Sequence, residues 1–93
     1  MPPESVTEVM VGEQPYAICR VGGAVTALNG ICLHAGGPLG QGQIHKGRVV
    51  CPYHLWEFDC RTGEYDYDPS QRVATYEVKL EGDDILLQVP EIA

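Results

Sequence analysis

The sequence predicts an all-β fold, a small antiparallel barrel or sandwich of short strands. Three observations predict it: β-like runs alternate with paired turn residues, the middle of the chain is too rich in glycine and proline for a regular helix, and no window shows an apolar repeat of 3.6 residues. With 93 residues, the chain is expected to form one domain spanning residues 1–93.

The N-terminal third of the chain predicts three strands. Residues 6–11 and 16–21 are β-like runs that contain several valines. The glycine pair at 22–23 is a hairpin turn signal, and residues 24–28 follow it as the returning strand. The Asn-Gly pair at 29–30 ends that strand.

The middle of the chain, residues 30–63, predicts two ordered loops separated by short strands. Glycine and proline are concentrated there, and they punctuate the chain into turns. The strand candidates are residues 48–50 and residues 56–59, and residues 61–63 form a turn signal.

The C-terminal segment shows clear alternation. Along residues 73–80 the even-numbered positions are apolar, so we expect them to face one side of a strand. Residues 81–84 predict a turn, and residues 85–89 predict a strand that pairs back. Before this segment, Tyr65 and Tyr67 fall in an acidic run that we expect to form a surface turn.

The charge balance excludes some classes of partner. Thirteen acidic and six basic residues give a net charge of −7, which disfavours nucleic acid because phosphate binding needs clustered lysine and arginine. No apolar run approaches the roughly 20 residues of a membrane span. The first ten residues have neither the basic nor the apolar region of a secretory signal, so we expect a cytoplasmic protein.

Four cysteines in a reducing compartment favour metal binding or redox chemistry over disulfides. Two of them, Cys19 and Cys60, lie in strand-like segments and are expected to be buried free thiols, with a disulfide between them as the alternative. The other two, Cys32 and Cys51, each stand close to a histidine.

Two short motifs carry the chemistry. The first is Cys32-Leu-His34, and the second is Cys51-Pro-Tyr-His54, with sixteen residues between His34 and Cys51. Residues two apart in an extended segment face the same side, and residues three apart can converge in a proline-containing turn. Each loop therefore offers one sulfur and one imidazole nitrogen. The third histidine, His45, lies outside both motifs and is expected on the surface.

Two metal centres fit this set of two sulfurs and two nitrogens. One is a single tetrahedral zinc ion. The other is a [2Fe–2S] cluster in which two thiolates hold one iron and two imidazoles hold the other. Structural zinc sites favour paired cysteines and paired histidines, which this chain lacks. Two loops that each offer one sulfur and one nitrogen suit the cluster better, because each loop then gives one ligand to each iron. In addition, the glycine-rich residues 35–40 would let backbone N–H groups approach its sulfides.

The two motifs, together with the residues 55–59 and 61–63 that follow the second one, resemble the Rieske domain, and most closely the stand-alone Rieske ferredoxins that serve aromatic-ring-hydroxylating dioxygenases. The resemblance covers nearly the whole chain, including a turn around Asp68-Pro69 expected to form a loop near the cluster. It implies that Cys32 and Cys51 hold a buried iron and that His34 and His54 hold an exposed one. The cluster-binding region is then about residues 30–63.

Two departures place the chain within that family. Rieske proteins of cytochrome complexes carry an extra disulfide between the loops, at positions that match Gly37 and Tyr53 here, so that bridge cannot form. They also place Ser and Tyr hydroxyl groups near the cluster, where this chain has Trp56 and Phe58. Fewer donors to sulfur predict a potential at the low end of the Rieske range, roughly −150 mV.

The predicted function is electron transport and not catalysis. Only His45 is left over, so no mononuclear iron site of the two-histidine, one-carboxylate type can be assembled. The resemblance implies a carrier that takes electrons from a flavin-dependent ferredoxin reductase and delivers them to a terminal oxygenase. We expect it to be a monomer, the simplest form of such a carrier. The alternatives are a small Rieske subunit of a nitrite-reductase-type enzyme and, in another class, a structural zinc-binding module.

Overall fold

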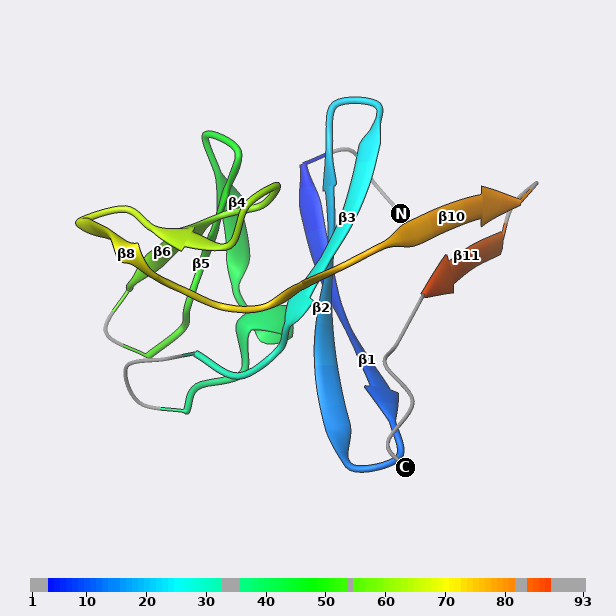
Figure 1. Ribbon diagram of the computed structural model, residues 1–93, viewed down its shortest axis with the longest axis horizontal. Coiled ribbons are helices and arrows are strands. Elements are labelled where there is room, and N and C mark those ends of the chain that lie inside the picture. The colour runs from blue at the N-terminus through cyan, green and yellow to red at the C-terminus, as the bar shows by residue number, and fades with distance from the viewer. Residues whose placement is uncertain (1–3, 33–35, 54, 82–83, 88–93) are drawn as a thin grey trace.

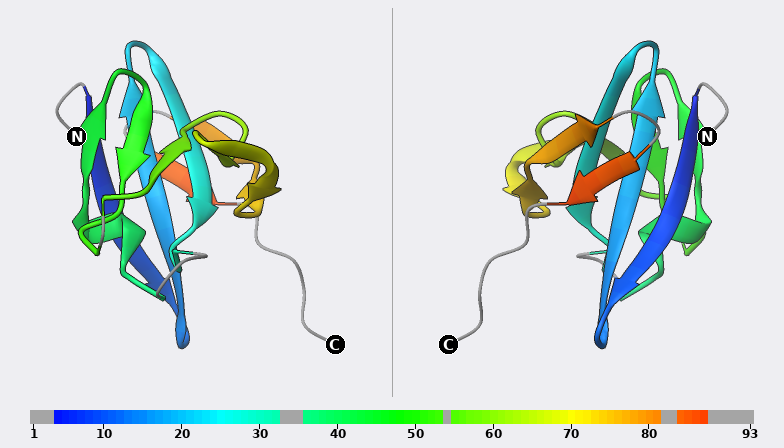
Figure 2. Two further views of the ribbon diagram at one scale, coloured as in Figure 1. Left: turned by 90° about the vertical axis from the view of Figure 1, so that its left-hand side faces the viewer. Right: turned by 90° about the vertical axis from the view of Figure 1, so that its right-hand side faces the viewer.

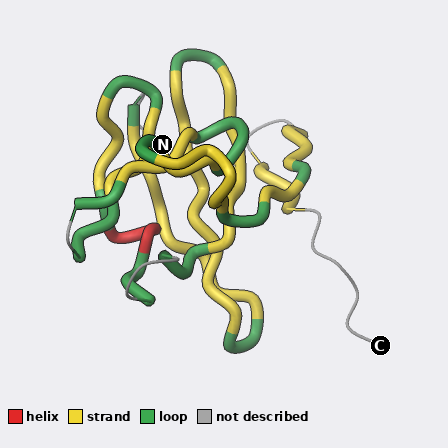
Figure 3. The backbone as a smooth tube through the Cα atoms, turned by 60° about the vertical axis from the view of Figure 1, so that its left-hand side comes forward, coloured by secondary structure: helices red, strands yellow, loops and turns green. Residues whose placement is uncertain are grey.

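The computed structural model describes residues 4–32, 36–53, 55–81 and 84–87. These residues form eleven β-strands and one short 3-10 helix, η1. The predicted all-β, antiparallel fold is therefore confirmed (Figure 1). The helix η1 is a single turn, drawn in red in Figure 3.

A four-stranded antiparallel sheet is built mainly from the N-terminal residues. Its order is β1 (Ser5–Val11), β2 (Gln14–Val21), β3 (Ala24–Asn29) and β9 (Thr75–Tyr76). Both predicted hairpin strands are confirmed, and the turn between them uses Gly22 with a φ of 60°, which glycine adopts without steric cost. The strand β9 joins this sheet from the far end of the sequence by pairing with β3.

A five-stranded antiparallel sheet follows in sequence order. Its strands are β4 (Gln43–His45), β5 (Arg48–Val50), β6 (Glu57–Asp59), β7 (Glu64–Tyr65) and β8 (Asp68–Arg72). The two predicted strands of this region, β5 and β6, are present. The short helix η1 (Leu39–Gln41) and β4 fill the glycine-rich stretch before them, and the β4–β5 turn has positive φ at Lys46 (52°) and Gly47 (77°).

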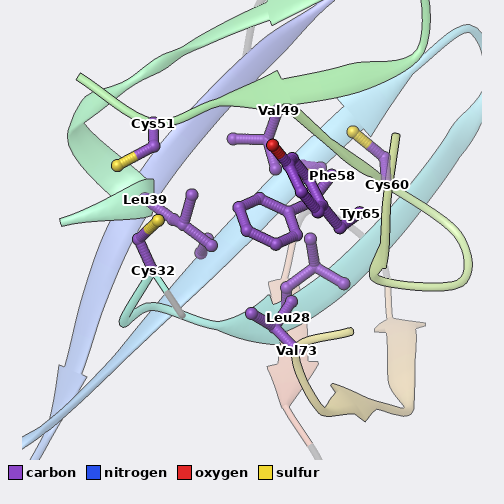
Figure 4. Packing of buried hydrophobic residues seen from close by; sticks show 11 residues of the cluster. Leu28, Cys32, Leu39, Val49, Cys51, Phe58, Cys60, Tyr65 and Val73 are labelled. Carbon is purple, nitrogen blue, oxygen red and sulfur yellow. The ribbon is translucent and has the colours of Figure 1, made fainter. Parts of the chain in front are cut away.

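The main hydrophobic core lies between these two sheets. The largest fully buried side chains come from both of them and from η1, and Figure 4 shows several of these side chains packed around Phe58. The cluster of buried residues comprises Ala17, Cys19, Leu28, Cys32, Leu39, Val49, Cys51, Phe58, Cys60, Tyr65 and Val73. Two of the predicted ligands, Cys32 and Cys51, thus belong to the edge of a packed core.

A second, smaller cluster covers the other face of the four-stranded sheet. Tyr16, Ile18 and Ala27 are buried there beneath the hairpin of β10 (Val78–Glu81) and β11 (Asp84–Leu87) (Figure 2). Because neighbouring residues of β2 face opposite sides, both faces of this strand are buried. The predicted turn between β10 and β11 falls partly on residues 82–83, which lie outside the described residues, as do residues 88–89 of the predicted last strand.

Three sequence expectations need correction. The turn expected around Asp68-Pro69 lies just before these residues, at 66–67, and Asp68–Arg72 form the strand β8, which pairs with β7 in the five-stranded sheet. The alternation expected over 73–80 fails only at its start, where Val73 is buried in the main core and Ala74 is exposed because the chain passes there from one sheet to the other. From residue 75 on it holds: Tyr76 and Val78 are half-buried against the smaller cluster, and the odd-numbered residues 75–79 are exposed. Tyr65 is 9% exposed and belongs to the core, although its neighbour Tyr67 is 85% exposed as expected.

Candidate metal centre

The first of the two predicted ligand loops follows β3. An isolated bridge between Ile31 and Pro38 brings the two ends of this loop together. Within it, the Cys32 N–H donates to the Gly37 carbonyl at 2.9 Å, and the Gly36 N–H donates to the Cys32 carbonyl at 3.0 Å. Gly36 has a φ of 68°, a conformation that glycine adopts readily. The backbone of Cys32 is therefore fixed by two hydrogen bonds within its own loop.

The second loop joins β5 to β6. The Cys51 N–H donates to the Trp56 carbonyl at 2.8 Å and closes the loop. Inside it, the Tyr53 N–H lies 3.4 Å from Cys51 Sγ, so a backbone donor already points at that sulfur. Leu55 has a φ of 59° and is 70% exposed, a strained conformation for a residue with a bulky side chain.

The two loops bring the thiols of Cys32 and Cys51 together at the edge of the core, 19 positions apart in sequence (Figure 4). Their exposed fractions are 2% and 0%, and a hydrogen bond joins the two side chains. Burial is the main reason that the pKa of the Cys51 thiol is raised to about 11, and the Cys32 thiol adds to that rise, against the lowering effect of the Tyr53 amide. A bound metal would favour the thiolate form of both side chains.

Gly37 closes the space around the Cys51 sulfur. A Cβ atom at Gly37 would lie 2.8 Å from Cys51 Sγ and 3.1 Å from Tyr53 Cβ. The residue at position 37 must therefore be small.

The histidines are the other half of the predicted ligand set. His34 and His54 lie outside the described residues, so their positions as ligands stay predictions. The two residues that flank His54, Tyr53 and Leu55, are 50% and 70% exposed, in contrast to the buried sulfurs. His45, at the end of β4, is exposed as expected and lines a groove beside Leu55 and Glu57.

An aromatic stack behind the second loop was not found by sequence reasoning. The rings of Trp56 and Tyr65 lie parallel, with centroids 3.9 Å apart and planes 5° apart. Phe58 approaches Tyr65 at 5.7 Å. The stack joins the loop that carries Cys51 to the strand β7. The signal available in the sequence was a second aromatic residue, Tyr65, beyond the turn at 61–63, but nothing local distinguished it from the exposed Tyr67.

The two remaining cysteines fulfil their prediction. Cys19 and Cys60 are free and are buried on the far side of the core from the Cys32 and Cys51 pair, as Figure 4 shows for Cys60. Among the described residues, no three side chains of His, Cys, Asp or Glu gather around one point, because both histidines of the motifs fall outside this part of the chain.

The donors that are described suit a Rieske cluster on its sulfur side. Two adjacent buried thiols match one iron, an amide donor supports one of them, and glycine at position 37 avoids a clash with the Cys51 sulfur. The same pair alone would also suit half of a zinc site. Comparison with known proteins distinguishes the two.

A family profile described as the Rieske [2Fe-2S] domain matches residues 1–77. The ferredoxin component of biphenyl 2,3-dioxygenase from Rhodococcus jostii (strain RHA1) is 37% identical over 79 residues, which cover 84% of this chain and 74% of that protein. The ferredoxin subunit of anthranilate 1,2-dioxygenase from Burkholderia cepacia is 31% identical over 72 residues, 76% of this chain and 67% of that protein. Both similarities span most of the chain.

Solved structures agree with the sequence matches. The ferredoxin of carbazole 1,9a-dioxygenase from Nocardioides aromaticivorans IC177 superposes with a TM-score of 0.83 at 30% identity, covering 94% of this chain and 86% of that one. A complex of reduced oxygenase and oxidised ferredoxin in carbazole 1,9a-dioxygenase gives a TM-score of 0.85 at 27% identity, covering 95% and 92%.

The chain belongs to the Rieske [2Fe–2S] domain family. Within that family it is a ferredoxin of the kind found in ring-hydroxylating dioxygenase systems, an electron carrier rather than a catalytic component. Its cofactor is a [2Fe–2S] cluster. No helix among the described residues is long and apolar enough to cross a membrane.

Proposed function

We propose that Cys32, His34, Cys51 and His54 hold the [2Fe–2S] cluster, with the two thiolates on one iron and the two imidazoles on the other. The observation that carries this assignment is the pair of adjacent, buried thiols contributed by two separate loops. When bound, the cluster supplies the gain and loss of one electron at a time. In this proposal the cluster-binding region is residues 30–63 of a single domain that spans residues 1–93.

The residues around the sulfurs would control the exchange. The core covers Cys32 and Cys51 and excludes water from the sulfur side. The Tyr53 amide donates to Cys51 Sγ at 3.4 Å, so it stabilises negative charge on that sulfur. The histidine side is the side from which an electron would leave, because its neighbours Tyr53 and Leu55 are exposed.

We further propose the two partners of the carrier: a flavin-dependent ferredoxin reductase that supplies electrons and a terminal oxygenase that receives them. The complex of oxygenase and ferredoxin in carbazole 1,9a-dioxygenase supports the second partner. We expect the carrier to be a monomer and to work in the cytoplasm, where the two cysteines outside the cluster, Cys19 and Cys60, would be kept reduced.

The docking face of this proposal is the tip of the two loops. Ile31, Tyr53 and Leu55 expose apolar surface there, with exposed fractions of 43%, 50% and 70%. Leu55 also holds a left-handed backbone conformation that glycine would adopt more easily. Strain at an exposed apolar residue is typical of a functional position. A net charge of −7 would add long-range attraction to a basic partner surface.

Ligand assignment is tested with two matched pairs of variants. Cys51→Ser and His54→Ala should lose the cluster and much of the folded stability, because the metal links two distant loops. Their controls, Cys60→Ser and His45→Ala, change the same residue types outside the motifs and should keep it. The measurements are iron and sulfide content per chain and the low-temperature EPR spectrum of the reduced protein. Full cluster content with an unchanged spectrum in His54→Ala, or a lone zinc in the parent protein, would refute the assignment.

Docking is tested by comparing two exposed apolar residues. Leu55→Ala should slow electron transfer to the oxygenase component of a biphenyl 2,3-dioxygenase, whereas Met10→Ala, at the distant end of β1 with 54% exposure, should not. Transfer by the parent protein should also change with ionic strength between low and physiological salt. Equal rates for the two alanine variants would disprove the proposed face, and a rate independent of salt would remove the electrostatic contribution.

A further inference from the structure

The core contains a second pair of thiols, far from the proposed cluster ligands. Cys19 lies on β2 of the four-stranded sheet, and Cys60 directly follows β6 of the five-stranded sheet. Their exposed fractions are 0% and 1%, and the two side chains are hydrogen-bonded to each other. The pair therefore bridges the two sheets through the middle of the protein.

A small pocket reaches Cys60 from the surface. Cys60 and Thr26 line it, together with Lys46, Asp59 and Arg61. Thr26 Oγ1 is buried without a nitrogen or oxygen partner and lies beside the Cys19 thiol. A molecule in this pocket would therefore contact Cys60 and Thr26, the two residues whose side chains interact with the Cys19 thiol. Simple filling of the core would explain two buried cysteines, but it would not require them to face each other where a pocket reaches one of them.

We propose that Cys19 and Cys60 form a redox-active dithiol that a small peroxide oxidises to a disulfide between the two sheets. The hydrogen bond from Cys60 is the main reason that the pKa of Cys19 is lowered, and the same bond raises the pKa of Cys60. Cys19 is therefore the sulfur favoured as thiolate, and Cys60 is the proton donor beside it.

The reaction balances with hydrogen peroxide as the oxidant. The Cys19 thiolate attacks one peroxide oxygen and becomes a sulfenic acid, while the departing hydroxide takes the Cys60 proton and leaves as water. The Cys60 thiolate then attacks the Cys19 sulfur, forms the S–S bond and displaces hydroxide. The two sulfurs lose two electrons in total, and the peroxide is reduced to one water and one hydroxide.

The resulting bond would enclose both ligand loops. Residues 32 and 51 lie between residues 19 and 60 in the sequence, so the disulfide would close a covalent ring around the cluster-binding region. Such a ring restricts the unfolded chain, and we expect the oxidised holoprotein to lose its cluster more slowly on heating than the reduced holoprotein does.

The test uses holoprotein treated with hydrogen peroxide and then digested with trypsin and a glutamate-specific protease. These proteases cleave the chain so that Cys19 falls in residues 14–20, Cys60 in residues 58–61 and Cys51 in residues 49–57. We expect a cross-linked species of residues 14–20 with 58–61, lighter than the sum of its two peptides by about 2 Da, which reducing agent removes. The visible absorbance of the cluster should persist.

Control variants complete the test. Cys19→Ala and Cys60→Ala should each abolish the cross-link and the slower loss of cluster, and Thr26→Val should slow its formation. The proposal is overturned if peroxide leaves both thiols free while the cluster survives, if it converts Cys60 to sulfinic or sulfonic acid without a cross-link, or if cross-links form only through Cys32 or Cys51. Because the cross-link is read from peptides, its absence would leave the electron-carrier proposal intact.

Discussion

Gly37→Ala is the sharpest perturbation that the structure suggests for the metal centre. Gly37 is buried, and a Cβ atom there would lie 2.8 Å from Cys51 Sγ and 2.9 Å from Tyr53 Cγ. Favourable contacts between non-bonded carbon atoms fall at about 3.5–4.0 Å, so the sulfur or the loop must move by roughly 1 Å. The backbone at Gly37 is not left-handed, so the added methyl group acts through this contact alone.

The cost follows from the size of the clash. Forcing one extra methyl group into a packed site typically costs about 1–3 kcal/mol. If that cost falls on the arrangement that holds the cluster, the loaded form should become about 5- to 150-fold less favoured relative to the empty form. The assay is iron content per chain after reconstitution under limiting iron, with the visible spectrum as a second measure.

The neighbouring glycine provides the matched control. A Cβ at Gly36 meets nothing within 4 Å, but its φ of 68° makes alanine strained there by about 1 kcal/mol. Gly36→Ala should therefore lower the stability of the fold slightly and keep its iron, whereas Gly37→Ala should lose iron preferentially. Equal iron content in the two variants would show that the contact with Cys51 Sγ does not govern cluster binding.

Three further outcomes are expected. A redox titration should give a midpoint near the low end of the Rieske range, about −150 mV, because Trp56 and Phe58 bring no hydroxyl donors; a midpoint well above 0 mV would contradict this. Tyr65→Ala should lower the free energy of unfolding by about 3–5 kcal/mol in urea titrations, while Tyr65→Phe, which keeps the stacked ring, should cost less than about 1 kcal/mol. The Ser70 hydroxyl lowers the pKa of Asp68 below its ordinary value of 3.8. This carboxylate therefore contributes stability above about pH 4 that is lost as the pH falls through its folded-state pKa, and Asp68→Asn should show a shallower loss in acid unfolding curves.

Much of the fold could be predicted because its signals are local. The hairpin of β2 and β3 follows from two β-like runs around a glycine pair, and both its strands and its turn agree with the structure. Cys19 and Cys60 were expected to be buried and free, and both are. In each case the residue type and its near neighbours in the sequence already favoured the strand, the turn or the burial that the structure shows.

The remaining features depend on segments that meet only in the folded chain. Alternation predicted that even-numbered residues from 74 onward face inward, and Tyr76 and Val78 do pack inward, yet Val73 is buried and Ala74 is exposed. Between β8 and β9 the chain passes from the five-stranded sheet to the four-stranded sheet, so Val73 and Ala74 do not continue the alternation of β9. Tyr65 likewise owes its burial to Trp56, nine positions earlier, and no local pattern distinguishes it from Tyr67.

By itself, the sequence determined the chemistry of the centre: which residue types stand in each loop, in what order, and how many positions apart. The residue type fixes which donor atoms are present, and a short spacing limits where the side chains can point. The donors and their grouping within each loop can therefore be inferred without the fold. Only the tertiary structure decided that Cys32 and Cys51 become adjacent and buried, and that Cys19 meets Cys60 across two sheets. Those contacts join residues 19 and 41 positions apart, and their formation depends on the packing of the whole core.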